Sequence, residues 1–314
     1  MLLPKKFKIF IISLLLLIIS ATQSHALENK ILIKIDNEIV TSVDIFEEIK
    51  FLKIFNPEAN NLSESELFEI SKNSILRDVI KKIEIMNFVD ELKVEDKFLL
   101  NLINRKYLNI EINSFDDFEN YLKKNNLNAK MIKEKFTIEI MWNDLIYQKF
   151  NKKIIIDKDK IKKEILQNPQ KDLQKEILLS EIVFSVNNKD ELQDKYEKIL
   201  LDIENIGFKK TALIHSNSDT ASNGGLIGWV KKDNLNKSIA KIISNLQPGQ
   251  FSKPIRTSSG FIMLKLEDER EQTLEFNLNE KIQEVIRFKR NEQLSQFSSM
   301  YFNKLKKNLM IYGL

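Results

Sequence analysis

Glycine is confined almost entirely to one stretch of this chain of 314 residues. Six of the seven glycines lie between positions 207 and 260, and the remaining one is Gly313. Because glycine adopts backbone conformations that other residues avoid, tight turns concentrate in this stretch. The sequence therefore predicts one compact, turn-rich unit within a chain that is otherwise largely helical.

The residues around these glycines predict a particular order of strands and helices. Residues 178–186 alternate as a half-buried strand does, and helices are expected over 192–203 and 208–215. A third helix is expected over 238–246, and the Pro-Gly turn after it leads into two closing strands. This order resembles that of a parvulin, the PpiC-type prolyl isomerase domain.

The glycine-rich loop at 224–228 could also be compared with a phosphate-binding loop. No Lys-Ser or Lys-Thr pair follows it, and the G-x-G-x-x-G spacing is missing. Turn geometry is the better explanation of these glycines. Trp229, which follows directly, is expected to pack under the sheet.

The flanking segments predict a helical domain. Residues 31–40 read as a β-hairpin, and the Thr-Ser-Val-Asp sequence at 41–44 is typical of a capping box. Apolar side chains then recur at helical spacing, notably from about 65 to 86 and from 128 to 150. The same spacing returns after the turn-rich unit, and a strand is expected over 308–312. The whole pattern is similar to the SurA-type periplasmic chaperones, here with a single parvulin-like domain.

This resemblance implies an α+β fold in which a helical N-terminal domain is completed by a C-terminal helix and strand. The inserted parvulin-like domain is expected to hold a small antiparallel sheet and about four helices. The domains are predicted as a signal peptide over 1–26, the helical domain over 27–170, the parvulin-like domain over 171–271 and the closing segment over 272–314. An Asn-Pro pair at 168–169 marks the hinge into the second domain.

The first residues have the pattern of a secretory signal. Three lysines within residues 5–8 precede an apolar run over 9–19, and Ser-His-Ala at 24–26 provides small residues for cleavage before Leu27. We expect a cleaved signal and a periplasmic protein. The alternative is an uncleaved anchor, but the apolar run is shorter than the roughly 20 residues that span a bilayer.

Composition excludes several kinds of site. The net charge of +4 falls to about +1 when the three lysines of the signal are removed, which gives no support to nucleic-acid binding. The chain has no cysteine, and His215 is the only histidine outside the signal. Thiolate chemistry and a multi-histidine metal site are therefore excluded, and no metal or cofactor is expected. His215 itself is expected to make an ordinary hydrogen bond at a helix end.

Prolyl isomerisation requires twisting an amide whose rotational barrier is about 20 kcal/mol. The resemblance implies that two histidines, a cysteine or aspartate, and hydroxyl groups surround the twisted bond. At the corresponding positions this chain has Glu181 for the first histidine and Ile262 for the second, Ser218 with the adjacent Asp219 for the cysteine or aspartate, and Ser259 among the hydroxyls. The alternative for Glu181 is a solvated strand residue without a catalytic role.

The proline-binding pocket of the family has better counterparts. Ile227, Leu235 and Ile239 stand where the family has leucine, methionine and phenylalanine. Such a pocket can bind a proline-containing segment without stabilising the transition state, and only interactions that strengthen in the transition state accelerate a reaction. The sequence therefore predicts a chaperone with a weak or inactive isomerase domain. The alternative is an active peptidyl-prolyl cis/trans isomerase, and a third possibility is a membrane-tethered foldase.

The helix over 128–150 carries side chains of the kind that bind varied polypeptides. Flexible thioethers and flat rings adapt to different sequences, so Met131, Phe136 and Trp142 are candidates for a client-binding groove. The alternative is a plain helical core. The resemblance implies that the partners are unfolded outer-membrane or periplasmic polypeptides and the outer-membrane assembly machinery.

Overall fold

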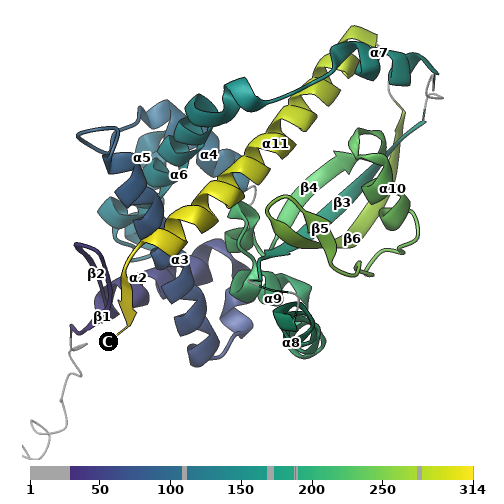
Figure 1. The fold of residues 1–314 in the computed structure, drawn as a ribbon. Coiled ribbons are helices and arrows are strands. Elements are labelled where there is room, and N and C mark those ends of the chain that lie inside the picture. The colour runs from purple at the N-terminus through teal and green to yellow at the C-terminus, as the bar shows by residue number, and fades with distance from the viewer. Residues whose placement is uncertain are drawn as a thin grey trace, which may run out of the picture.

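The computed structural model of the protein describes residues 29–107, 112–167, 173–186, 188, 190–273 and 278–313. The predicted signal peptide and the Asn-Pro hinge at 168–169 lie outside the described residues. Figure 1 shows a mainly helical part and a smaller part that contains a four-stranded sheet, with one long helix extending along both.

The N-terminal hairpin forms as the sequence predicts. Strands β1 (Ile31–Ile35) and β2 (Glu38–Thr41) are antiparallel, and helix α2 (Ser42–Phe55) begins directly after them. The Thr41 hydroxyl accepts a hydrogen bond from the Asp44 backbone, while the Asp44 carboxylate accepts one from the Thr41 backbone N–H at 2.7 Å. This is a capping box, and it fixes the direction in which α2 leaves the hairpin.

The helical part is built on an aromatic core. The rings of Phe51 and Phe55 on α2 pack against Tyr107 and Phe136, and all four side chains are buried. Further elements of this part are η1 (Pro57–Asn61), α3 (Glu64–Met86), α4 (Asp96–Lys106), α5 (Phe115–Lys124), α6 (Ala129–Phe150) and η2 (Asn151–Lys153).

A helix and a strand near residue 314 return to this helical part. Helix α11 (Leu278–Asn308) packs against α3 and α6, and strand β7 (Ile311–Gly313) pairs with β1. The small sheet therefore has the order β2-β1-β7. On α6, the fully buried Trp142 donates its indole N–H to the Ser298 hydroxyl of α11 at 2.8 Å.

The second part is a four-stranded antiparallel sheet with helices on both faces. Its strands β3 (Leu173–Phe184), β4 (Leu226–Lys231), β5 (Ile255–Thr257) and β6 (Gly260–Thr273) have the order β4-β3-β6-β5. Helices α8 (Asp190–Ile206) and α9 (Phe208–His215) pack on one face, and α10 (Lys237–Ile243) and α11 pack on the other. Two short turns, η3 (Asp219–Asn223) and η4 (Lys232–Asn234), flank β4.

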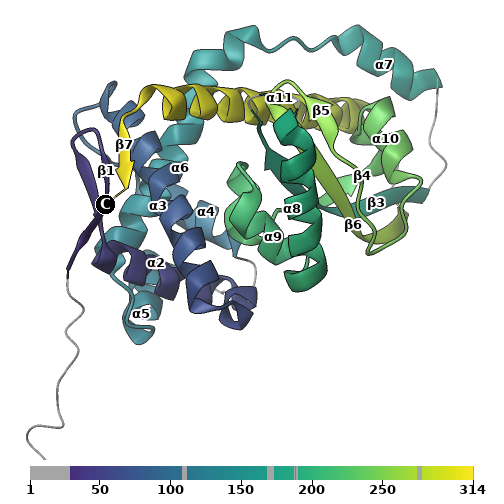
Figure 2. The same cartoon turned by 60° about the horizontal axis from the view of Figure 1, so that its bottom comes forward.

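Helix α7 (Lys158–Gln167) is an element that the sequence analysis did not predict. It runs alongside α11, as Figure 2 shows, and its buried Ile161 packs with Val285 and Ile286 of that helix. The segment is rich in lysine and has only a narrow apolar stripe, so its sequence gives a weak helical signal.

The predicted α+β class is confirmed by this arrangement of helices and small antiparallel sheets. Across the described ranges, from residue 29 to residue 313 with their gaps, every helix is too short or too polar to span a bilayer.

Candidate functional site

A carboxylate and three hydroxyl groups meet where β3 passes the loop after α9. Glu181 lies on β3, and its Oε1 accepts a hydrogen bond from the Thr220 hydroxyl at 2.8 Å. The Thr220 oxygen lies 2.7 Å from the Ser218 hydroxyl, which in turn lies 2.9 Å from that of Ser216. The two serines are buried, so the chain of hydroxyls is held firmly beside the strand.

Glycine at position 225 is what lets this loop approach β3 so closely. The Glu181 backbone N–H donates to the Gly225 carbonyl at 2.8 Å, and the Gly225 N–H donates to the Thr220 carbonyl at 2.9 Å. Gly225 has a φ of +79°, and a Cβ atom here would lie 2.1 Å from the Glu181 carbonyl oxygen. The glycines of this loop thus serve turn geometry, as the sequence analysis concluded.

The environment of Glu181 favours its protonated form. Burial raises the pKa of the Glu181 carboxyl, and the neighbouring charge of Asp219 acts in the same direction. Hydrogen bonds from Thr220 and Ser218 lower this pKa, and the net shift is upward. Glu181 is therefore a half-buried, hydrogen-bonded group, which differs from the solvated strand residue that the sequence analysis considered.

Two basic side chains of α3 hold the same loop from the helical part. Lys81 forms an ion pair with Asp219 at 2.6 Å, and Arg77 donates to the carbonyl oxygens of Ser218 at 2.9 Å and Ser216 at 3.2 Å. The sequence analysis missed both residues. They lie four residues apart on one side of α3, and nothing in the surrounding sequence indicates a partner more than a hundred residues further along the chain.

Three of the predicted residues meet in one apolar cluster on the face of the sheet that α10 and α11 cover. Ile262 on β6, Leu235 after η4 and Ile239 on α10 all pack against its buried core. Phe288 of α11 packs against the same cluster, and sequence reasoning missed it because it lies outside the parvulin-like unit. Ile262, which was predicted to stand at the second histidine position, therefore packs against a core of aliphatic side chains.

The remaining predicted residues of this unit lie nearer its rim. Ile227 is exposed at a bulge of β4, between the pairs Leu226–Ser180 and Gly228–Leu179. The Ser259 hydroxyl lies in the turn between β5 and β6, 3.2 Å from that of Thr257.

Trp229 was expected to pack under the sheet, and this prediction was wrong. The indole is 37% exposed and lies beneath the guanidinium group of Arg270, whose central carbon is 4.0 Å from the ring centroid. Trp229 lies on the edge strand β4 and Arg270 on β6, and the ring is covered by this cation rather than by a helix.

His215 makes hydrogen bonds at the end of α9, as expected. Its Nε2 lies 2.5 Å from the Asp202 carboxylate of α8, and its Nδ1 lies 3.1 Å from the Lys195 ammonium group. An ammonium group can only donate, so Nδ1 accepts and the proton of the neutral ring is on Nε2. Burial lowers the pKa of His215, and the nearby charge of Lys195 lowers it further, against the opposing effect of Asp202.

The three residues predicted for a client-binding groove are core residues in this structure. Phe136 and Trp142 are fully buried, and Met131 packs against the aromatic core. They belong to two different clusters, so the structure does not bring them together. Their arrangement matches the alternative of a plain helical core.

Hydroxyl groups can donate hydrogen bonds to a carbonyl oxygen, and the aliphatic cluster can receive an apolar ring. The one histidine outside the predicted signal lies elsewhere, where Asp202 and Lys195 hold it.

Comparison with known proteins matches residues 174–268 to the rotamase family, described as the PPIC-type PPIASE domain. Chaperone SurA of Hahella chejuensis is 41% identical over 71 residues, which are 22% of this chain and 16% of that protein. Chaperone SurA of Pseudomonas putida is 26% identical over 168 residues, which are 50% of this chain and 39% of that protein. This chain thus spans less than half the length of the curated relatives that it matches here.

Solved structures of the same kind are also similar. A crystal structure of a PpiC-type peptidyl-prolyl cis-trans isomerase domain is 31% identical, covers 31% of this chain and 93% of its own, and has a TM-score of 0.28. A SurA-like chaperone of Campylobacter jejuni is 19% identical, covers 91% and 99%, and has a TM-score of 0.34. The predicted resemblance to SurA-type chaperones with a PpiC-type domain is confirmed by the family match and the curated relatives.

Proposed function

We propose that this chain binds unfolded polypeptides and has weak or no prolyl isomerase activity. The proposal starts from its PpiC-type domain and from its similarity to the SurA chaperones. The clients would be outer-membrane or other exported proteins, and the site of action would be the periplasm after removal of residues 1–26. Docking on the outer-membrane assembly machinery belongs to the same proposal. So does the division into a helical domain over 27–170, a PpiC-type domain over 171–271 and a closing segment over 272–314.

The observation that carries this proposal is the chemistry at the two positions where the family has histidine. The Thr220 hydroxyl donates a hydrogen bond to Glu181, and Ile262 packs against the aliphatic cluster, as Phe288 does. An acceleration requires groups that interact more strongly with the twisted imide than with the planar one. An aliphatic side chain supplies no such group, whereas it supports binding of a proline ring or another apolar side chain.

Clients would contact apolar side chains that are exposed in this conformation rather than the buried ones predicted from the sequence. Met86 and Phe88 are exposed at the end of α3, and Phe46 is exposed on α2. Exposed aromatic and thioether groups of this kind fit the adaptable binding of varied sequences.

Two measurements on the chain without residues 1–26 test the proposal. The first is suppression of aggregation of an unfolded barrel protein, which we expect at near-equimolar chaperone. The second is NMR exchange spectroscopy on a short Ala-aromatic-Pro peptide, whose uncatalysed exchange takes tens to hundreds of seconds. We expect an acceleration of less than tenfold, which corresponds to about 1.4 kcal/mol of barrier.

An active isomerase is the second candidate, and one observation favours it. The half-buried Glu181 and the hydroxyls of Ser218 and Thr220 form a polar network in the place where the family has its catalytic groups. If exchange is accelerated far beyond tenfold, Glu181→Gln and Ser218→Ala should each reduce the acceleration. Lys162→Gln, an exposed change on α7, should leave it unchanged.

A further inference from the structure

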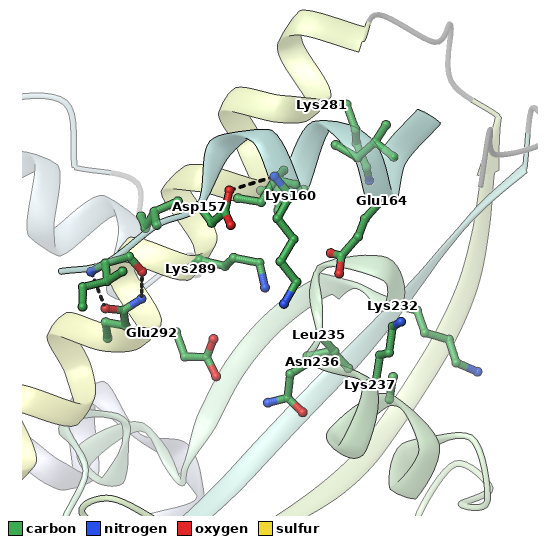
Figure 3. A pocket seen from close by; sticks show the side chains of 17 residues that line it. Asp157, Lys160, Glu164, Lys232, Leu235, Asn236, Lys237, Lys281, Lys289 and Glu292 are labelled. Carbon is green, nitrogen blue, oxygen red and sulfur yellow. Dashed lines mark hydrogen bonds between the residues drawn. The ribbon is translucent and has the colours of Figure 1, made fainter. Parts of the chain in front are cut away.

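A cavity of about 840 Å³ lies away from the hydroxyl network, between the segment that contains α7 and the PpiC-type unit. Helix α7 and the segment before it form one wall, α11 forms the second, and η4 with α10 forms the third (Figure 3). Its volume lies in the range of pockets that bind organic ligands, roughly 300–1,000 Å³. The cavity therefore has room for a few side chains of an extended peptide.

Part of the cavity lining is apolar, and this part is called the floor below. Ile161 and Ile165 of α7, Val285 of α11, and Leu235 and Ala240 beside the sheet all line it. Leu235 also packs in the aliphatic cluster with Ile262, so the cavity and the predicted proline pocket share a side chain. An apolar side chain that entered here would be removed from water on three sides.

The rim of the cavity is rich in lysine. Lys160 and Lys289 project into it from α7 and α11 in Figure 3, and Lys237 reaches it from α10. Within the part of the chain that the structure describes, none of these three ammonium groups lies within ion-pair distance of a carboxylate. By contrast, Lys81, Lys135 and Lys231 elsewhere all form ion pairs.

The acidic groups of the cavity do not balance this charge. Five lysines line it against three acidic residues. Asp157 accepts a hydrogen bond from the Lys160 backbone N–H at 2.8 Å. Glu292 lies near the charge of Lys289 and accepts a hydrogen bond from Asn236. The cavity thus combines an apolar floor with an excess of positive charge at the rim.

Two hydrogen bonds fix the position of one wall. The Ile155 N–H donates to the Gln293 side-chain oxygen at 3.2 Å, and the Gln293 amide donates to the Ile155 carbonyl at 3.0 Å. This pair ties the extended segment before α7 to α11 while the Ile155 side chain remains 84% exposed at the cavity. The exposed isoleucine extends the apolar surface beyond the floor.

We propose that this cavity binds an extended polypeptide segment in which apolar side chains are flanked by aspartate or glutamate. The apolar side chains occupy the floor, and the carboxylates pair with Lys160, Lys289 and Lys237. This inference rests on the proposed function, because it assigns one client-binding site and the class of segment that the site prefers. It places that site at the junction of α7, α10 and α11, separate from the hydroxyl network around Glu181.

The test is fluorescence anisotropy with labelled Asp-Leu-Phe-Glu-Leu-Asp peptide and the whole chain without residues 1–26. A second peptide has glutamine and asparagine in place of the acids, and a third has lysine. We expect the acidic peptide to bind most tightly and to weaken with added salt, because exposed charges are screened. Lys160→Gln with Lys289→Gln should weaken the acidic peptide by about fivefold to tenfold and leave the neutral one nearly unchanged.

The matched control is Lys162→Gln with Lys163→Gln, two exposed lysines of α7 that do not line the cavity. It removes the same charge and should bind all three peptides as the wild type does. A second variant, Ala240→Phe, fills the cavity from α10 and should weaken the acidic and neutral peptides alike. Circular dichroism establishes that each variant is folded.

Equal binding of the acidic peptide by the cavity variants and the wild type would overturn the inference. So would an equal loss in the control variant, since net charge alone would then explain the effect. The proposed function is judged separately, by suppression of aggregation of a barrel protein. If the wild type suppresses aggregation and the cavity variants bind peptide normally, the chaperone proposal stands and the cavity assignment fails.

Discussion

Lys81 of α3 and Asp219 of η3 form an ion pair at 2.6 Å that joins the helical part to the loop beside Glu181. The Lys81 side chain is only 6% exposed, and its ammonium group also lies 5.6 Å from the Trp142 ring centroid. A buried ammonium group of this kind is stable only with a well-placed anion. Asp219, predicted as part of a catalytic site, therefore also has a structural task between the two parts.

Substitutions at this pair should be coupled. Asp219→Asn leaves the Lys81 ammonium group without its anion, and we expect a loss of about 1–3 kcal/mol in the free energy of unfolding. Adding Lys81→Met should recover part of that loss, which gives a coupling energy of about 1 kcal/mol in a double-mutant cycle. Urea unfolding measures all four proteins.

The control is the pair between Lys93 and Glu91, whose atoms are 3.5 Å apart and whose side chains are 80% and 70% exposed. Its coupling energy should be close to zero, because solvent screens such pairs. A coupling energy near zero for Lys81 and Asp219 as well would mean that the ion pair does not hold the loop.

Two glycines of the same loop should differ in their tolerance of alanine. At Gly225, which has φ +79°, a Cβ atom would lie 2.1 Å from the Glu181 carbonyl oxygen, whereas at Gly228, which has φ +103°, it would meet no atom within 4 Å. Gly228→Ala then costs only backbone strain, about 1–3 kcal/mol. Gly225→Ala adds a displacement of β3 or the loop, and we expect the larger loss of stability in thermal unfolding. The reverse order would show that the loop moves away easily.

Stability should fall with acidification because of His215. Burial lowers the pKa of His215 below its ordinary value of 6.5, so the unfolded chain binds a proton at a higher pH than the folded chain does. The contribution is therefore complete above pH 6.5 and is lost as the pH falls below that value, with a slope of at most about 1.4 kcal/mol per pH unit.

His215→Asn is the variant that isolates this effect. In the chain without residues 1–26 it removes the only histidine. The difference in unfolding free energy between wild type and variant, followed from pH 7.5 to about 5.5, should shrink as the pH falls. A difference that stays constant over this range would contradict the neutral, buried state of the ring.

The hydrogen bond between Trp142 and Ser298 should contribute to the stability of the helical part. Ser298→Ala leaves the buried indole N–H without its 2.8 Å acceptor, and we expect a loss of about 1–3 kcal/mol. Ser295→Ala, an exposed change on the same helix, is the matched control and should be neutral or slightly stabilising. Equal effects of the two substitutions would contradict a role for the hydrogen bond.

The elements that were predicted correctly are those whose sequence signal lies within a few neighbouring residues. The hairpin before α2, the capping box at Thr41 and the extent of α6 follow from alternation, side-chain capping and helical spacing. Helix α7 was not predicted, because its apolar stripe is narrow and the helix that it packs against, α11, is distant in the sequence. Trp229 was misplaced because alternation along a strand does not reveal that the strand lies at an edge.

The candidate site was also predicted only where its residues belong to local motifs. Motif positions within the turn-rich unit located Glu181 and Ser218, and the structure connects them through Thr220. Arg77 and Lys81 reach that loop from α3, more than a hundred residues earlier in the chain. A single sequence carries no local signal for a contact at that distance. Phe288 beside the aliphatic cluster was missed for the same reason.

The pairing of β7 with β1 delays the completion of the three-stranded sheet. Ile33 is paired with Gly313 and Ile35 with Ile311, so β1 acquires its second neighbour only when synthesis has reached residue 313. Contacts between such distant residues form slowly, because a long loop must close first. A protein that we propose binds unfolded chains therefore has an incomplete sheet of its own until residue 313 has been made.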